Sequence, residues 1–239
     1  MSKIYAFWTG NNAMSDVRKA SLASMASSGC EIVLVDNDNI HDFIEPHRLH
    51  NGYYYLHYAH RADYLRCYFM RSIGGGYSDI KKINSSWTPY FEMLASDETL
   101  WGVGYREISR HGVANIYQSS CILQQSRERR CRSWIQWRWL QLHYKALIGN
   151  CAFIFKANTR MVQEWWDELN ARMDYLLPQL KQYPARYPKE RPGHWYEGVV
   201  SSYPVPWSFL LGDILQPLAL KYRKRLSRAL PPPDFTNYQ

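Results

Sequence analysis

Three short stretches near the start of the chain decide the fold: IYAFW at residues 4–8, TGNN at 9–12 and EIVLV at 31–35. The first and third are rich in β-branched and aromatic side chains and too short for helices, so they predict two buried strands. Ser15 is placed to cap a helix between them that ends near Gly29. A strand, a helix and a second strand form a βαβ unit. Its loops gather at the carboxyl ends of the strands, where open α/β sheets bind their ligands.

Helices and strands continue to alternate along the rest of the chain. The expected elements are helices over 61–72, 87–95, 134–144 and 159–177 and strands over 77–80, 100–104 and 151–155. Residues 106–132 lack a clear apolar period and are expected to form a long mobile loop. The pattern predicts one α/β domain over residues 1–230, with a mostly parallel sheet flanked by helices, followed by a proline-rich tail over 231–239.

The composition points to an anionic partner that contains a ring. The chain has 239 residues and a net charge of +8, with 10 Trp and 19 Tyr. Basic charge favours nucleic acid, phosphorylated small molecules or a membrane surface, and flat aromatic side chains suit nucleobases and sugar rings alike. The five cysteines are scattered without a C-x-x-C pair, so no disulfide framework or zinc site is expected. There is no membrane-spanning run and no signal-peptide pattern, so we expect a cytoplasmic protein, soluble or peripherally attached to a membrane.

Two charged motifs are placed to meet at the ligand-binding edge of this sheet. Asp63 and Arg66 have the i,i+3 spacing that puts both side chains on one face of the predicted helix. The glycines at 74–76 let the chain reverse, which brings that face next to the strand ending in Asp79. Carboxylates can hold sugar hydroxyls, and the guanidinium of arginine suits phosphate oxygens. A carboxylate, a guanidinium and a second carboxylate are therefore expected to converge in one crevice.

The order of these residues, A-D-x-x-R at 62–66 followed by G-G-G-Y-S-D at 74–79, resembles a family of GT-A glycosyltransferases. That family includes eukaryotic mannosyltransferases, the glucosylating clostridial toxins and capsular-polysaccharide synthesis proteins. The resemblance implies a GT-A, Rossmann-like fold and transfer of a sugar from a nucleotide-diphosphate donor, such as a UDP-sugar, to a glycan, polysaccharide or glycolipid. It also implies that Asp63, Arg66 and Asp79 are catalytic residues that contact the donor.

Other segments extend the resemblance to donor binding. Ile148-Gly149-Asn150 is similar to the family's I-G-N segment, whose Asn lies near the donor sugar, and the loop after the first strand corresponds to the one that holds the nucleobase. The predicted donor-binding residues are Phe7, Trp8, Thr9, Gly10, Asp36, Gly76, Asn150 and Trp207.

Lys81 stands where the family carries the second aspartate of its D-x-D motif, which is a ligand of a divalent metal. Lys81 could itself neutralise the leaving diphosphate and so act as a fourth catalytic residue. Alternatively, Asp79 and His194 could hold Mn²⁺ or Mg²⁺. Strand alternation places Asp79 and Lys81 on one face only if the strand stays regular through Ile80, and a bulge there would turn Lys81 to solvent. Metal use therefore stays open at this point.

Two other questions stay open. If the reaction inverts the sugar's configuration, the acceptor base could be Glu107, Glu197 or Asp213. The basic, aromatic-rich composition would also suit a nucleic-acid-binding module, although the chain has no RNP-like, KH-like or helix-turn-helix signature. Lys81 additionally allows a catalytically inactive protein of the same fold.

Overall fold

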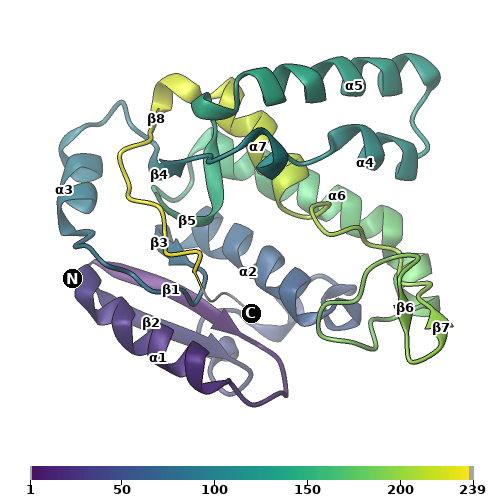
Figure 1. The fold of residues 1–239 in the computed structure, drawn as a ribbon, viewed down its shortest axis with the longest axis horizontal. Coiled ribbons are helices and arrows are strands. Elements are labelled where there is room, and N and C mark those ends of the chain that lie inside the picture. Colours follow the sequence, from purple (N-terminus) through teal and green to yellow (C-terminus); the bar gives the residue numbers. More distant parts are fainter. Residues whose placement is uncertain (1, 237–239) are drawn as a thin grey trace.

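Within residues 2–236, which this computed structural model describes, six strands form one central sheet in the order β2-β1-β3-β5-β4-β8 (Figure 1). The strands are β1 (Lys3–Trp8), β2 (Glu31–Asp36), β3 (Gly75–Ser78), β4 (Gly102–Arg106), β5 (Ile148–Phe155) and β8 (Leu226–Ser227). β5 pairs antiparallel with β3 and β4, and the other three pairings are parallel. The predicted α/β class, with a mostly parallel sheet flanked by helices, is confirmed.

Helices cover both faces of the sheet. They are α1 (Asp16–Ser24), α2 (Tyr58–Ser72), α3 (Thr88–Ser96), α4 (Ile116–Ile122), α5 (Arg127–Leu142), α6 (Arg160–Gln182) and α7 (Gly212–Lys221). Because side chains alternate along a strand, Ile4 and Ala6 of β1 belong to the core beneath α1 and α3, whereas Tyr5 and Phe7 belong to the core with α2, α6 and α7. None of the helices in the described chain combines the length and the apolar character needed to cross a membrane.

The order of the strands creates a crevice at the carboxyl ends of β1 and β3. β1 lies between β2 and β3 and is parallel to both. The chain reaches β2 through α1 and returns to β3 through α2, and these two helices cover opposite faces of the sheet. Ligands of open α/β sheets bind at such a reversal of strand order. The crevice is bordered by Trp8 at the end of β1 and by Asp79, which follows β3.

The segment 106–132, expected to be a long loop, is mostly helical. It holds α4 and the first turns of α5, and each helix has a side-chain cap at its amino end, from Asn115 and Ser126 respectively. The apolar period was weak because α4 buries Ser119 and Ser120 as well as apolar residues. The first turns of α5, over 127–132, contain four arginines and no large apolar residue. Helix caps were therefore a better signal here than periodicity.

The proline-rich segment after residue 230 does not end the fold. The backbone amide of Leu230 donates to the carbonyl of Gly104, and that of Asp234 donates to the carbonyl of Lys82. Pro233 is buried. In Figure 1 this last segment runs from β8 back across the sheet toward β1. Proline cannot donate a ladder hydrogen bond, but its neighbours here supply the bonds that hold the segment down.

Candidate functional site

A cleft of about 570 Å³ lies at the carboxyl ends of β1 and β3. Its polar and aromatic wall comes from every part of the chain: Trp8, Arg18, Asp63, Arg66, Tyr77, Asp79, Lys81, His111, Asn115, Asn150, Cys151, Lys189, Trp207 and Ser208. The four predicted catalytic residues, Asp63, Arg66, Asp79 and Lys81, are all in this set. The structure thus brings together residues that are up to 18 positions apart on two elements.

Arg66 is the centre of this group. Its Nη2 lies 3.1 Å from Oδ1 of Asp63, one turn earlier on α2, and 3.5 Å from Oδ1 of Asp79. Its Nη1 donates to the carbonyl of Asn150 at 2.8 Å, and the guanidinium lies 4.4 Å from the centre of the Tyr77 ring. One side chain therefore ties α2 to the end of β3 and to β5, which fixes the floor of the cleft.

Asp79 is held as an anion. Burial by itself would raise the pKa of its carboxyl, but Arg66, Lys81 and a 2.6 Å hydrogen bond from the Tyr77 hydroxyl together keep that pKa below the ordinary value. A carboxylate that is charged, oriented and only 14% exposed is preorganised to accept hydrogen bonds from a ligand.

The pKa of the Asp63 carboxyl is shifted in the opposite direction. Burial raises the pKa of its carboxyl to about 7, and the nearby Asp79 adds to this effect while Arg66 opposes it. Two carboxyl groups that share one arginine thus have pKa values pushed apart. Such separation is typical of sites that bind or transfer protons, although buried ion-pair networks also produce it.

Lys81 points into the cleft even though the strand before it is not regular. The amide of Lys81 donates to the carbonyl of Asp79 at 2.7 Å, which closes a three-residue turn and ends the strand at Ser78. Arg18 of α1 holds this turn by donating to the carbonyl of Ile80 at 2.7 Å. The ammonium of Lys81 is nevertheless buried, 3.6 Å from Asp79 and 3.3 Å from the Cys151 sulfur. The strand thus ends before Asp79, unlike in either alternative, yet Lys81 lies in the cleft lining and not in solvent.

A divalent cation does not fit beside Asp79. The ammonium of Lys81 and the guanidinium of Arg66 occupy the two sides of this carboxylate, so a metal there would meet two like charges. His194 lies exposed before the hairpin of β6 (Trp195–Tyr196) and β7 (Val199–Val200) and does not line the cleft. No cluster of three or more potential His, Cys, Asp or Glu ligands occurs in residues 2–236. The structure does not assemble the expected Asp79–His194 pair.

A smaller pocket of about 150 Å³ continues from the cleft around Trp8. Thr9, Gly10 and Tyr58 line it, and Arg18 and Lys189 line both cavities. A Cβ atom at Gly10 would lie 2.5 Å from the Tyr58 ring, so the pocket needs glycine at this position. Two aromatic rings and two cations at the junction make a compartment suited to a base and its phosphates.

Two buried histidines position Trp207 at the far side of the cleft. The rings of His57 and His60 stack with their centres 3.8 Å apart, and Nε2 of His60 lies 3.2 Å from the Trp207 carbonyl oxygen. Burial lowers the pKa of His57 to about 2 and that of His60 to about 3, so both rings are neutral. Arg191 lies 4.7 Å from the centre of the Trp207 ring. The indole is thereby fixed as one wall of the cleft.

Three predicted donor-binding residues serve the fold instead. Phe7 is buried and stacks on Tyr77, with ring centres 5.4 Å apart. Gly76 lies inside β3, where an added Cβ would come within 3.0 Å of Ile4. Asp36 accepts hydrogen bonds from the backbone amides that follow it and lines neither cavity. Alternation of β1 explains why Trp8 lines both cavities and Phe7 lines neither, because the two side chains point to opposite faces of the sheet.

The three carboxylates considered as acceptor bases also lie outside the cleft lining. Glu107 is buried against Gln216, whose Nε2 is 3.3 Å from the Glu107 carboxylate. Glu197 accepts a 2.8 Å hydrogen bond from Tyr187 near the exposed hairpin. Asp213 binds the hydroxyls of Ser119 and Ser208. Among the residues the cleft does contain, Asp63 and Asp79 are the carboxylates.

Sequence reasoning missed Arg18, Tyr58, Lys189 and the stretch from His111 to Asn115. Arg18, Lys189 and the 111–115 stretch lie far in sequence from the A-D-x-x-R and G-G-G-Y-S-D motifs and reach the cleft only through the tertiary fold, whereas Tyr58 lies on α2 one turn before Ala62. The signal available for Arg18 was its place in the first turn of the helix that follows the first strand. That turn faces the carboxyl end of the sheet in any βαβ unit.

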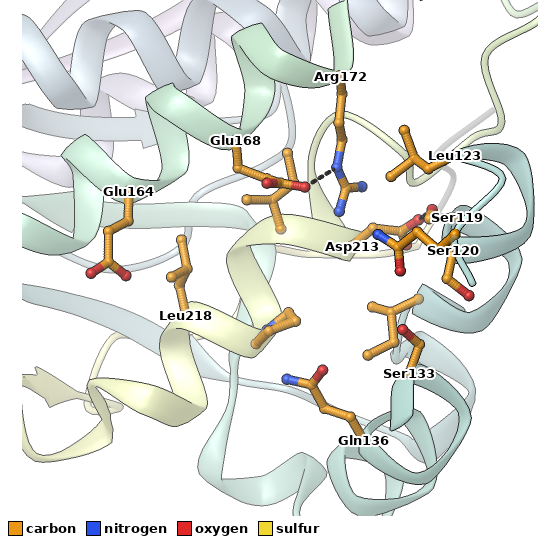
Figure 2. Close-up of a pocket in the computed structure, with 14 residues that line it drawn as sticks. Ser119, Ser120, Leu123, Ser133, Gln136, Glu164, Glu168, Arg172, Asp213 and Leu218 are labelled. Carbon is orange, nitrogen blue, oxygen red and sulfur yellow. Dashed lines mark hydrogen bonds and ion pairs between the residues drawn. The ribbon is translucent and has the colours of Figure 1, made fainter. Parts of the chain in front are cut away.

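A separate polar pocket of about 350 Å³ lies among α4, α5, α6 and α7. Figure 2 shows Arg172 paired with Glu168, at 2.8 Å, and Asp213 turned toward Ser119. Arg172 also donates to the Phe209 carbonyl at 2.7 Å. These charged groups satisfy one another, and the first turn of α7 divides this pocket from the cleft. The Ser119–Asp213 hydrogen bond links α4 to α7, and Arg172 ties α6 to the segment before α7.

No protein-family model matches the chain, and no curated protein or solved structure matches it significantly. What the fold and the site define is a class: an α/β domain with a mixed-charge cleft and an aromatic side pocket at the reversal of its strand order.

Proposed function

We propose that this protein is a glycosyltransferase of the GT-A type, which moves a sugar from a nucleoside diphosphate donor, such as a UDP-sugar, to a hydroxyl of a glycan, polysaccharide or glycolipid. The observation that carries the proposal is the meeting of Asp63, Arg66, Asp79 and Lys81 in one cleft beside an aromatic pocket. This set offers oriented carboxylates for sugar hydroxyls and cations for a diphosphate.

The chemistry of the walls suggests how the donor is arranged. The base would enter the pocket between Trp8 and Tyr58, and the diphosphate would lie along Arg18 and Lys189, which line both cavities. The sugar would then reach the floor of the cleft. Oδ1 of Asn150 supports this arrangement, because it is buried there with no hydrogen-bond partner among the described residues. A buried acceptor of this kind is stabilised when a ligand hydroxyl donates to it.

In the transfer step, the bond between C1 of the sugar and the diphosphate oxygen breaks, the acceptor oxygen bonds to C1, and the acceptor's hydroxyl proton passes to the departing diphosphate oxygen. Negative charge grows on the departing diphosphate, so fixed cations lower the barrier. We assign this role to Lys81 together with Arg18 and Lys189. The ammonium of Lys81 then supplies the electrostatic stabilisation of the diphosphate that a divalent metal supplies in the D-x-D enzymes. No step needs Mn²⁺ or Mg²⁺.

The proposal is tested by measuring release of nucleoside diphosphate from UDP-glucose, UDP-galactose and GDP-mannose, with and without added oligosaccharide. Asp79→Asn should abolish release, because the amide keeps the shape of the side chain but loses the charge that orients donor and Arg66. Asp36→Asn, at the end of β2, two strands away from β3 in the sheet and outside both cavities, is the matched control and should release diphosphate like the wild type. Wild-type rates in Asp79→Asn would refute the assignment of this cleft.

A further inference from the structure

The outer side of α5 carries a row of large apolar side chains that nothing in the described chain covers. Trp134, Ile135, Trp139 and Leu142 are 49%, 57%, 54% and 62% exposed. Their spacing places them on adjacent turns of one face of the helix. Figure 1 shows α5 along the outer edge of the molecule. Single exposed apolar residues are ordinary, but four on one helical face mark an interaction surface.

The opposite side of the same helix anchors it to the domain. Leu140 is fully buried and belongs to a small core with Val113, Ile116 and Leu147. Trp137 is partly buried against that core. The exposed apolar face with Trp134 and Trp139 is therefore distinct from the face through which α5 packs on the domain. α5 has one apolar side for the domain and another for a partner.

Arginines accompany the exposed apolar row. α5 contains Arg127, Arg129, Arg130, Arg132 and Arg138 and a single acidic residue, Glu128. The helix thus has a net charge of +4, half of the +8 of the whole chain. Four of the five arginines are exposed, at 127, 129, 132 and 138.

We infer that α5 docks on an anionic lipid surface, lying flat in the membrane interface. Tryptophan and aliphatic side chains insert between headgroups there, and arginines bind lipid phosphates. A second copy of this chain fits less well, since a self-paired α5 would bring together two helices that each carry a net charge of +4. Nucleic acid fits less well too, because Ile135 and Leu142 offer neither stacking nor hydrogen bonds to a polynucleotide.

Cys131 provides a probe of this face. It is the exposed one of the five cysteines and lies one turn before Ile135 on the same side of α5. The full chain, labelled at Cys131 with an environment-sensitive fluorophore, is mixed with vesicles of phosphatidylcholine alone or with phosphatidylglycerol added. We expect flotation with the anionic vesicles, a blue-shifted label signal, and release at high salt.

Matched variants distinguish binding through this face of α5 from nonspecific adsorption of the protein to vesicles. Trp134→Ala/Trp139→Ala should weaken vesicle binding by about a hundredfold, since each buried indole contributes roughly tenfold. Arg132→Gln/Arg138→Gln should weaken binding to anionic vesicles and leave the fold intact. Trp195→Ala removes a still more exposed indole, 72% exposed, on the β6–β7 hairpin and should bind like the wild type. Circular dichroism checks that every variant is folded.

Several results would overturn the inference. The protein could fail to float with anionic vesicles, it could float without a change in the fluorescence of the Cys131 label, or both double variants could bind as the wild type does. A wild-type dimer that the tryptophan variant dissociates would assign the face to a second copy. Binding of single-stranded RNA that the same variants abolish would assign it to nucleic acid. Because the test uses neither donor nor acceptor, its outcome is independent of the proposed transferase reaction.

Discussion

Lys81 concentrates the distinctive chemistry of this site in one side chain. Its ammonium is buried beside Asp79 and Cys151, and the turn that carries it is held by Arg18. A buried charge is costly unless its partners stay in place, so the position is built for a cation and not for an adaptable surface residue. This is the feature that sets the site apart from the metal-binding motif it resembles.

Replacing Lys81 by methionine tests this role. Lys81→Met keeps most of the side-chain volume but removes the charge, so affinity for UDP should fall roughly ten- to hundredfold, the range of one charge-assisted hydrogen bond. EDTA should leave wild-type affinity unchanged. Isothermal titration calorimetry measures both. Full loss of wild-type binding in EDTA, restored by Mn²⁺, would contradict the role of the lysine.

Asp63 should make stability depend on pH. Its pKa rises from 3.8 in the unfolded chain to about 7 in the folded protein, so the folded state holds this proton more tightly. Ionisation of Asp63 therefore costs stability progressively as pH rises between these two values. Asp63→Asn cannot ionise, so its melting temperature relative to wild type should be higher at pH 8 than at pH 5. An equal difference at both pH values would show that Asp63 does not carry the shifted pKa.

At the scale of elements, α5 joins the domain through few residues. Leu140→Ala should cost about 2–5 kcal/mol of unfolding free energy, because Leu140 is fully buried. Leu142→Ala, two residues later and 62% exposed, should change it by less than about 0.5 kcal/mol. Urea denaturation of the two variants compares the same chemical change on the two sides of one helix. Similar losses in both would mean that α5 packs differently.

Local patterns predicted much of the fold and the floor of the site. The strands at 4–8 and 31–35 are present, and the i,i+3 pair of Asp63 and Arg66 meets Asp79 as the glycine turn suggested. These features depend on neighbours in sequence. The irregular turn that still buries Lys81 could not be foreseen, because Arg18 and Cys151 hold it from distant elements. α4 was not predicted for a similar reason: its buried serines are residues typical of loops, and it is contact with distant elements that buries them.

Across the whole molecule, basic side chains gather in two separate places. The cleft gathers its cations at the strand ends, around Arg18 and Lys189, whereas α5 carries a second basic group on the outer edge. The final described segment, from β8 to residue 236, runs from β4 back across the sheet toward β1. It pairs with β4 and places Phe235 4.2 Å from the ammonium of Lys81. The last described residues thus pack against the lysine of the cleft without lining the cleft themselves.

The central claim is that the cleft binds a nucleoside diphosphate through its own cations. The most direct measurement is calorimetric titration of UDP, with GDP in parallel, into the wild type and into Arg18→Gln/Lys81→Met, all in EDTA. We expect saturable binding at one site in the wild type for at least one of the two nucleotides, and loss of that binding in the double variant. Equal affinity in the two proteins, or no binding of either nucleotide by the wild type, would contradict it.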